Sequence, residues 1–290
     1  MISKIINIIR FSYYIPFLLI IFLNSLYVKL LRILDFRNYS KVWEETLQKY
    51  IDSSIGKKIY IDKKKFIKFY CPNTITSFRS KSFFLKEPET IQWMNKFGGN
   101  KKVFYDIGSN VGLYSIYYSK KFNSQTFSFE PSFKNLEILS RNIQLNSLSK
   151  LITIIPNAVS SKNKISKFYQ LNFTQGFSGA TFDNKKIEKQ MANFLKKEFN
   201  PIEYFTLGIN LDNFIKSKIF PKPDLIKIDV DGAELDVILA IKKILNKQKK
   251  LSLLIEIDNR IKKNIKVHKL IKSLGFKLQS TKGSNYIYNK

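Results

Sequence analysis

A short acidic and glycine-rich stretch, DIGSNVG at residues 106–112, lies between two apolar parts of the sequence. Gly108 and Gly112 would let the backbone approach a ligand closely, and the segment that follows would offer the N-terminal amides of a helix. The dinucleotide fingerprint Gly-x-Gly-x-x-Gly is absent, and Asp106 would repel a diphosphate. An amino group or a zwitterion would be attracted instead. The stretch therefore predicts a ligand that carries positive charge.

Two further polar side chains follow the next two predicted strands. Glu130 ends the run TFSFE, 24 residues after Asp106, where an acid accepts hydrogen bonds from both ribose hydroxyls. Asn157 follows the third strand, and its amide suits an adenine edge. Each side chain alone is a weak signal, since a lone acid at a strand end is more often a helix cap, but three in register favour a nucleoside that carries an amino acid. This predicts S-adenosylmethionine as the cofactor, bound by Asp106, Gly108, Asn110, Gly112, Glu130 and Asn157.

Several acidic residues lie close together after a later predicted strand, in PDLIKIDVDGAELDVILA at residues 223–240. An alcohol becomes a good nucleophile only when its proton is accepted, and the single histidine, His268, is predicted on a helix face away from the site. The predicted catalytic residues are therefore Asp229, Asp231 and Glu234, with Glu256 behind them. Asp229 would be the base or would orient the acceptor.

Two alternatives for these carboxylates stay open. Asp229 could instead cap the following helix and shape the cofactor pocket. The carboxylates could also hold Mg²⁺, since hard cations prefer oxygen ligands, but the spacing matches no metal motif. We therefore predict no metal site.

Alternating strands and helices must position these residues. Five apolar runs are typical of strands, and each precedes a segment of helical period: residues 103–107, 126–129, 151–155, 224–228 and 251–257. This alternation predicts an α/β fold with a mostly parallel sheet, in which ligands bind outside the carboxyl ends of the strands. Near the C-terminus, FKLQS and NYIYN predict a closing antiparallel hairpin.

The region before the first motif predicts two short strands, KKIYID and KFIKFYC, and a helix over EPETIQWMNKF. A stretch over residues 160–207 interrupts the regular alternation. Insertions at the ligand-facing edge commonly form the acceptor pocket, so we place substrate choice there, together with residues 60–85 and Arg79. The expected organisation is an apolar N-terminal helix (1–34), an extension (35–100) and a catalytic domain (101–290).

The apolar segment FSYYIPFLLIIFLNSLYV at residues 11–28 contains no charge. Eighteen helical residues are just long enough to cross a hydrocarbon core of about 30 Å. Pro16 and Asn24 weaken that interpretation, so a spanning anchor, a helix lying in the membrane interface and a helix packed on protein all stay open. More Lys and Arg residues follow the segment than precede it, which predicts a location at the cytoplasmic face of a membrane.

The formal net charge of +28 over 290 residues is large enough to suggest nucleic-acid binding. However, 44 of the 50 basic residues are lysines, and they are scattered over every segment rather than gathered in one stripe. We therefore expect a solvated basic surface, or attraction to an anionic membrane or acidic glycan, before nucleic acid. The single Cys71 excludes a disulfide framework and a cysteine-rich zinc site.

The motifs together resemble the FkbM family of S-adenosylmethionine-dependent methyltransferases over about residues 86–260. The resemblance rests on DIGSNVGLYS, FEPSFKNLEILSRNIQLN, NLDNFI, LLIEID and the segment at residues 223–240. It implies a Rossmann-like class I methyltransferase fold with a seven-stranded sheet. It also implies O-methylation of a hydroxyl on a polyketide-type small molecule, or on a sugar of a glycan or lipid.

Two positions depart from the family pattern, and two other functions stay open. Ser109 stands where alanine is usual, and Asp231 stands where glutamate is usual, so that carboxylate reaches one methylene less far.

A nucleic-acid methyltransferase would suit the charge, but the Asn-Pro-Pro-aromatic motif of base-amine methylation is absent. A membrane-tethered protein with a relic cofactor fold would be expected to lose Asp106, Gly108 or Glu130, and all three are present.

Overall fold

The structure is a computed structural model that describes residues 18–27, 29–30, 33, 45–46, 56–183, 202–214, 220–258 and 265–290. The chain divides into two compact units, Met1–Ile55 and Gly56–Lys290. The boundary between them falls inside the extension expected over residues 35–100.

In the first unit, residues 18–27 form a helix whose apolar side chains are exposed. Ile20 and Phe22, for example, are 64% and 63% exposed. None of the helices in the described residues is long and apolar enough to cross a membrane. Residues 11–17 and 28 of the predicted apolar segment lie outside the described residues.

The second unit is built on a seven-stranded sheet with the strand order β12-β13-β11-β10-β3-β4-β5. Its strands are β3 (Phe104–Ile107), β4 (Thr126–Phe129), β5 (Ile152–Ile155), β10 (Leu225–Ile228), β11 (Ser252–Glu256), β12 (Lys277–Lys282) and β13 (Asn285–Asn289). The first five are parallel, and β12 and β13 form an antiparallel hairpin at one edge. The predicted strands, the hairpin and the seven-stranded α/β fold are therefore confirmed.

The strand order places the topological switch point between β3 and β10. From β3 the chain proceeds outward through β4 to β5, and it later returns to β10 on the other side of β3. In such sheets ligands bind at the carboxyl ends of the strands, beside the switch point. The predicted site residues that follow β3, β4, β5 and β10 must therefore meet there.

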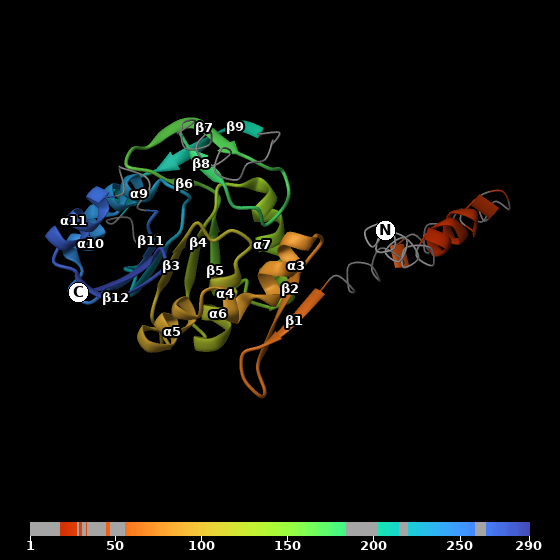
Figure 1. The fold of residues 1–290 in the computed structure, drawn as a ribbon, viewed down its shortest axis with the longest axis horizontal. Coiled ribbons are helices and arrows are strands. Elements are labelled where there is room, and N and C mark those ends of the chain that lie inside the picture. Colours follow the sequence, from red (N-terminus) through yellow and green to blue (C-terminus); the bar gives the residue numbers. More distant parts are fainter. Residues whose placement is uncertain are drawn as a thin grey trace, which may run out of the picture. The chain divides into compact units, whose positions relative to one another are not determined.

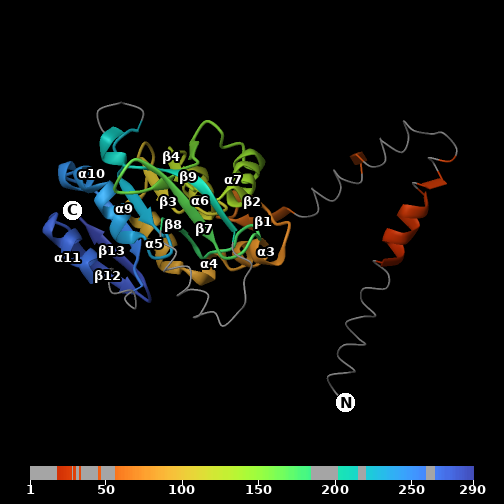
Figure 2. The same ribbon diagram turned by 90° about the horizontal axis from the view of Figure 1, so that it is seen from above.

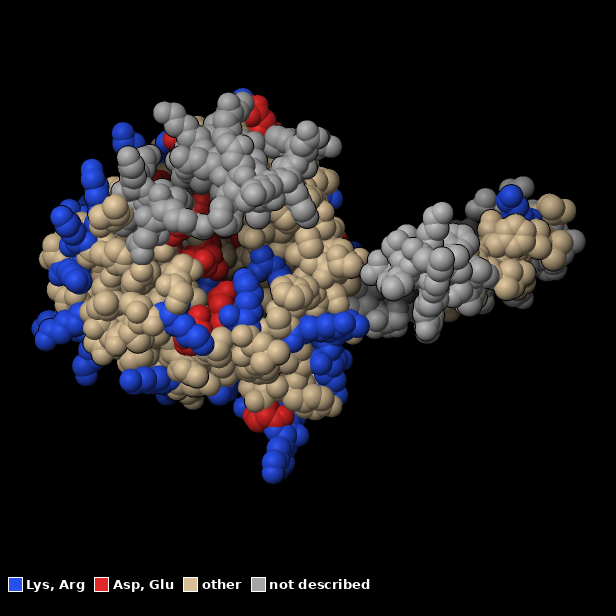
Figure 3. All heavy atoms as spheres, in the orientation of Figure 1, with Lys and Arg blue, Asp and Glu red and all other residues tan. Residues whose placement is uncertain are grey.

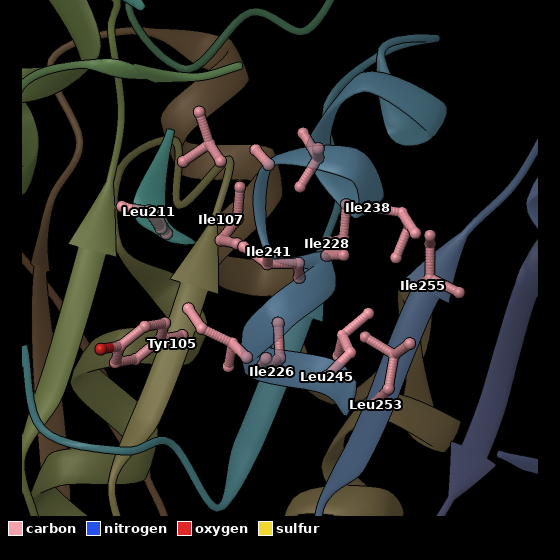
Figure 4. Packing of buried hydrophobic residues seen from close by; sticks show 14 of the residues in the cluster. Tyr105, Ile107, Leu211, Ile226, Ile228, Ile238, Ile241, Leu245, Leu253 and Ile255 are labelled. Atoms are coloured by element: carbon pink, nitrogen blue, oxygen red, sulfur yellow. The ribbon is translucent and has the colours of Figure 1, made fainter. Parts of the chain in front are cut away.

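Helices cover both faces of the sheet (Figure 1, Figure 2). One face is covered by α9 (Glu234–Ala240), α10 (Lys242–Lys247) and α11 (Ile265–Ser273); the other carries α5 (Pro88–Phe97), α6 (Leu113–Phe122) and α7 (Phe133–Leu145). Alternate residues of a strand point to opposite faces. Ile226 and Ile228 of β10 accordingly point toward Ile238 and Ile241 within the large apolar core (Figure 4). On the other face, Trp93 of α5 donates a hydrogen bond to Ser252 at 2.7 Å.

The extension that precedes β3 packs beside α7. It contains the hairpin β1 (Gly56–Tyr60) and β2 (Phe66–Tyr70), then α3 (Thr74–Lys81) and α4 (Phe83–Lys86). Asn142 of α7 and Asn146, the residue that caps its C-terminus, accept hydrogen bonds from the backbone of β2, at Tyr70 and Lys68, both 2.8 Å long. The two predicted short strands and the lead-in helix are confirmed.

A second sheet occupies the stretch that interrupts the alternation. Its strands are β6 (Ala158–Val159), β7 (Lys164–Gln170), β8 (Ala180–Phe182) and β9 (Ile202–Ile209), in the order β6-β9-β7-β8. These strands were not predicted from the sequence. Figure 1 shows this sheet beyond the carboxyl ends of β3 and β4, where the insertion was expected to contribute to the site.

Candidate active site

The carboxyl ends of β3, β4, β5, β10 and β11 surround a cavity of about 170 Å³. Four carboxylates and two cations line it: Glu130, Asp229, Asp231, Glu256, Arg79 and Lys86. Figure 3 shows acidic side chains gathered in a hollow of this face, whereas Lys and Arg side chains are scattered around it. A cavity lined by carboxylates favours a ligand with positive charge, in a protein whose net charge is itself strongly positive.

Asp106 lies behind this cavity rather than in its wall. The side chain is fully buried, and its Oδ2 accepts a hydrogen bond from Ser115 of α6 at 2.5 Å. Ser128 of β4 donates in turn to Ser115 at 2.7 Å. Burial raises the pKa of Asp106, and the nearby Lys227 ammonium and the Ser115 hydrogen bond oppose that rise. Asp106 thus fixes α6 against the sheet.

The two predicted glycines are required by contacts within the protein. Both have left-handed backbone, with φ of 83°. A Cβ on Gly108 would lie 1.9 Å from the carbonyl oxygen of Asp229, and a Cβ on Gly112 would lie 2.3 Å from Leu139 Cδ1. Gly108 lines the cavity, but Gly112 does not. The close approaches are therefore those of β3 to β10 and of α6 to α7.

Glu130 and Asn110 are joined at the ends of two neighbouring strands. Glu130 Oε2 accepts the backbone N–H of Asn110 at 2.8 Å, and its Oε1 accepts that of Ser132 at 2.9 Å. Burial raises the pKa of Glu130 to about 7 against the effect of these two hydrogen bonds. Asn110 has a left-handed φ of 51°, which asparagine adopts more readily than most residues. Both residues line the cavity, as does Asn157, whose Nδ2 donates to the Leu207 carbonyl at 3.4 Å.

A buried lysine holds Asp229 in place. Lys227 is 1% exposed, and its Nζ lies 2.7 Å from Asp229 Oδ2. It also lies 4.9 Å from the centroid of the Tyr114 ring, and the Tyr114 hydroxyl donates to Glu87 at 2.7 Å. Burial alone would lower the pKa of Lys227, but the negative charges of Asp229, Glu87 and Asp106 raise it. The lysine therefore stays charged at neutral pH.

Asp229 and Glu256 form a carboxyl pair at the ends of β10 and β11. Burial alone would raise the pKa of Asp229, but Lys227 and a hydrogen bond from Glu256 hold it below its usual value. The charge of Asp229, followed by burial, raises the pKa of Glu256 to about 8. At neutral pH the pair therefore holds one proton, on Glu256, beside an ionised Asp229. Such a carboxylate in a cavity wall suits proton acceptance or the orientation of a hydroxyl.

The other two predicted acids make backbone contacts. Asp231 Oδ2 accepts the N–H of Gly179 at 2.7 Å, so it links the end of β10 to the loop before β8. Burial and the charge of Asp229 raise the pKa of Asp231. Glu234 is 2% exposed, and its Oε1 accepts the N–H of Gly232 at 2.8 Å. Asp231 lines the cavity, whereas Glu234 lies outside its wall.

A comparison of the sequence with protein families matches the Methyltransferase FkbM domain over residues 106–278. The matched range begins at Asp106, contains the switch-point residues described above and covers more than half of the chain. The chain belongs to the FkbM methyltransferase family. The chain thus carries the methyltransferase domain of an S-adenosylmethionine-dependent family, which confirms the family, the enzyme class and the cofactor predicted from the sequence.

Two curated proteins are similar to parts of this FkbM methyltransferase. Methyltransferase sdnD of Sordaria araneosa is 29% identical over 150 residues, which cover 46% of this chain and 58% of that protein. Hexuronic acid methyltransferase AglP of Haloferax volcanii is 28% identical over 152 residues, which cover 52% and 55%. The match thus spans little more than half of each relative. Among solved structures, the precorrin-6y C5,15-methyltransferase of Geobacter metallireducens is similar with a TM-score of 0.42 and 14% identity, over 71% of this chain and 88% of that one.

The site of the FkbM methyltransferase fits its cofactor chemically. S-adenosylmethionine carries a sulfonium and an ammonium, which suit a cavity whose wall holds four acidic side chains, among them the ionised Asp229. Glu130 accepts two backbone N–H groups and a hydrogen bond from the Asn135 side chain, which leaves one acceptor position of the carboxylate for a ribose hydroxyl. In the described part of the chain, no group of three or more His, Cys, Asp or Glu side chains is arranged to hold a metal ion.

Sequence reasoning missed Lys227 as a member of the site. A lysine inside the buried run LIKI is itself a signal, because lysine is almost never fully buried without a partner. The pairing between Lys227 and Asp229 follows from the strand itself, since residues two apart share one face. Glu256 was expected only behind the acids, and its contact with Asp229 depends on the register of β10 against β11.

Proposed function

We propose that this methyltransferase transfers the methyl group to a hydroxyl oxygen of a sugar, glycan, lipid-linked or polyketide-type acceptor. The observation that carries the proposal is the ionised Asp229 in the cavity wall, between Lys227 and Glu256. A sugar acceptor is supported by the similarity to AglP, which is named as a hexuronic acid methyltransferase. A hydroxyl needs a proton acceptor that is unprotonated at neutral pH, and the ionised Asp229 supplies one.

The cofactor residues are assigned by their places along the sheet. Glu130, at the end of β4, would accept hydrogen bonds from the ribose, and Asn157, after β5, would bind the adenine edge. Gly108 and Asn110 would contact the methionine part at the turn after β3. Asp106 and Gly112 would support the site without contacting the cofactor, because their contacts hold α6 in position.

When bound, S-adenosylmethionine supplies an electrophilic methyl group on a positively charged sulfur. Asp229 would accept the proton of the acceptor hydroxyl as that oxygen forms its bond to the methyl group. Lys227 keeps Asp229 ionised beforehand, and Glu256 limits its motion through their hydrogen bond. Asp231 would shape the acceptor side, since it fixes Gly179 in the loop whose Phe177 and Ser178 line the cavity.

The experiment is a comparison of wild type with Asp229→Asn, using a panel of sugars that includes glucuronic acid as the methyl acceptor. Loss of the base should lower the rate of methyl transfer about 10²- to 10⁴-fold, while S-adenosylhomocysteine binding measured by calorimetry is retained. Glu137→Asn, an exposed acid on α7, is the matched control. Methyl transfer by Asp229→Asn at the wild-type rate would contradict the role of Asp229, and labelling of RNA instead of sugars would contradict the acceptor class.

We also propose that residues 18–27 lie in a membrane interface at the cytoplasmic face. The helix exposes apolar side chains, Leu19 and Phe22 among them, to 54% and 63%, and interfacial helices bury such apolar surface at the boundary between headgroups and acyl chains. The full chain should float with vesicles of phosphatidylcholine and phosphatidylglycerol. The double variant Leu19→Glu, Phe22→Glu should stay unbound, and equal flotation of both proteins would show that the helix is not the contact.

A further inference from the structure

Two cations, Arg79 and Lys86, stand among the acidic side chains of the site. Of the described lysine and arginine residues, these two line the cavity of about 170 Å³ at the carboxyl ends of the strands, called the main cavity below. Both also line a smaller adjoining cavity, next to Tyr114 and Lys227. The two cavities share Gly108, Asn110 and Asp229 as well, so the cations lie where the cavities meet, beside the turn after β3.

Arg79 is held in a defined position with part of its guanidinium left available. Its Nε donates to the carbonyl oxygen of Gly176, whose own N–H donates to Asn135 at 2.9 Å. Gly176 is confined because a Cβ there would lie 2.9 Å from the Thr76 methyl group. Among the described residues, the Arg79 side chain makes this hydrogen bond through Nε and makes none through its two terminal nitrogens. Its two terminal amino groups have the geometry that binds a carboxylate with two parallel hydrogen bonds.

Lys86 adds a second positive charge that remains accessible. Its side chain is 53% exposed, and its Nζ lies 3.2 Å from Glu87. Glu87 is only 11% exposed, but the ammonium of Lys86 is half solvated and has three N–H donors, so it can bind a ligand carboxylate as well. The charge of Lys86 helps to lower the pKa of Asp229, and the charge of Arg79 opposes the rise in the pKa of Asp231, so each cation lies near one of these acids.

The order of strands indicates which end of the cofactor reaches these cations. An adenosine held by Asn157 and Glu130 occupies the ends of β5 and β4. The next strand in the sheet is β3, followed by β10, so the methionine part of a cofactor held in this way would extend over the turn at Gly108 and toward the smaller cavity. The single carboxylate of the cofactor lies at that end of the molecule.

We propose that Arg79 and Lys86 form a carboxylate-binding subsite that takes the methionine carboxylate of the cofactor. The inference rests on the proposed placement of the cofactor. Helices α3 and α4, which carry the two cations, precede the range matched by the family at residues 106–278. The subsite would thus be a contribution of the N-terminal extension to cofactor binding. A carboxylate on the acceptor is the other source of the same chemistry, and the experiment separates the two.

The test is calorimetry on the full chain with two ligands that differ at one group. S-adenosylhomocysteine has the carboxylate, and its decarboxylated analogue keeps the ammonium and the adenosine. Arg79→Met should weaken S-adenosylhomocysteine binding about tenfold, as expected for a lost charge-assisted hydrogen bond, and leave the analogue unaffected. Lys86→Met should act in the same direction with a smaller factor, and it keeps the Gly176 contact. Lys81→Met, an exposed lysine of α3, is the matched control.

The outcomes distinguish this inference from the broader assignment. Wild type that fails to bind S-adenosylhomocysteine would contradict the cofactor placement itself. Wild-type binding with unchanged affinity in both Arg79→Met and Lys86→Met would overturn the subsite alone. Unchanged cofactor affinity together with loss of glucuronate binding in the variants would also overturn it, and would assign the cations to the acceptor.

Discussion

The two faces of the central sheet differ in chemistry. The face under α9 and α10 carries Ile226 and Leu253, which are fully buried among other aliphatic side chains. The face under α6 places Lys227, Asp106 and Ser128 side by side on three adjacent strands, and all three are buried too. Burial of apolar surface stabilises the fold directly, whereas buried charges cost free energy unless they are paired. The apolar face thus supports the fold, and the polar face connects the sheet to the cavity.

The largest effect on the free energy of unfolding is expected for Lys227→Met, which replaces a charged side chain of the polar face with an apolar one, as on the opposite face. The methionine fills much of the same volume, but Asp106 and Asp229 lose their cation. Breaking a buried ion pair in this way should lower the free energy of unfolding by about 3–5 kcal/mol, as measured by urea denaturation at neutral pH. The deficit should shrink as the pH falls, because protonation of the two acids removes their uncompensated charge.

The matched change on the apolar face is Leu253→Ala. It should cost about 2–5 kcal/mol through lost burial and a cavity, and this deficit should be the same at every pH because no charge is involved. Cofactor affinity should also persist, since Leu253 lies in the core away from the cavity wall. The comparison between the faces would fail if both variants showed the same dependence on pH.

The sequence predicts the apolar half of this comparison better than the polar half. Apolar runs at regular spacing identify β3, β4, β5, β10 and β11, because burial on both faces demands such runs. The second sheet was missed because β7 and β9 are half-exposed and pair with each other across a long separation in sequence. Periodicity within one run contains no information about such pairing.

For the site, too, the sequence predicts some features and leaves others to the tertiary structure. The sequence places the acids at strand ends, and the structure brings Glu130, Asp229 and Asp231 to one cavity. The contacts of each acid depend on tertiary structure: Asp231 meets Gly179, 52 residues away, and Gly108 meets the Asp229 carbonyl. Glycine spacing predicted a close approach to a ligand, and of the two glycines Gly108 lines the cavity, whereas Gly112 packs against Leu139. Such roles require the register of neighbouring strands.

The smallest effect, counted per pH unit, concerns the proton on Glu256, where the polar face meets the cavity. Its pKa is raised from an ordinary 4.5 to about 8 in the folded protein, so between these values the folded state holds a proton that the unfolded state releases. Stability contributed by this group is therefore full below about pH 4.5 and falls as the pH rises toward about 8, by at most about 1.4 kcal/mol per pH unit for one proton.

Glu256→Gln should remove that dependence, because the amide cannot release a proton. Urea denaturation at several pH values between about 5 and about 8 should give the variant a flatter decline in stability than wild type. Glu130, with a pKa of about 7, should leave a residual decline in the same direction. Identical slopes in wild type and variant would mean that Glu256 is ionised in the folded protein, and Asp229 would then lack the neutral partner that holds it ready to accept a proton.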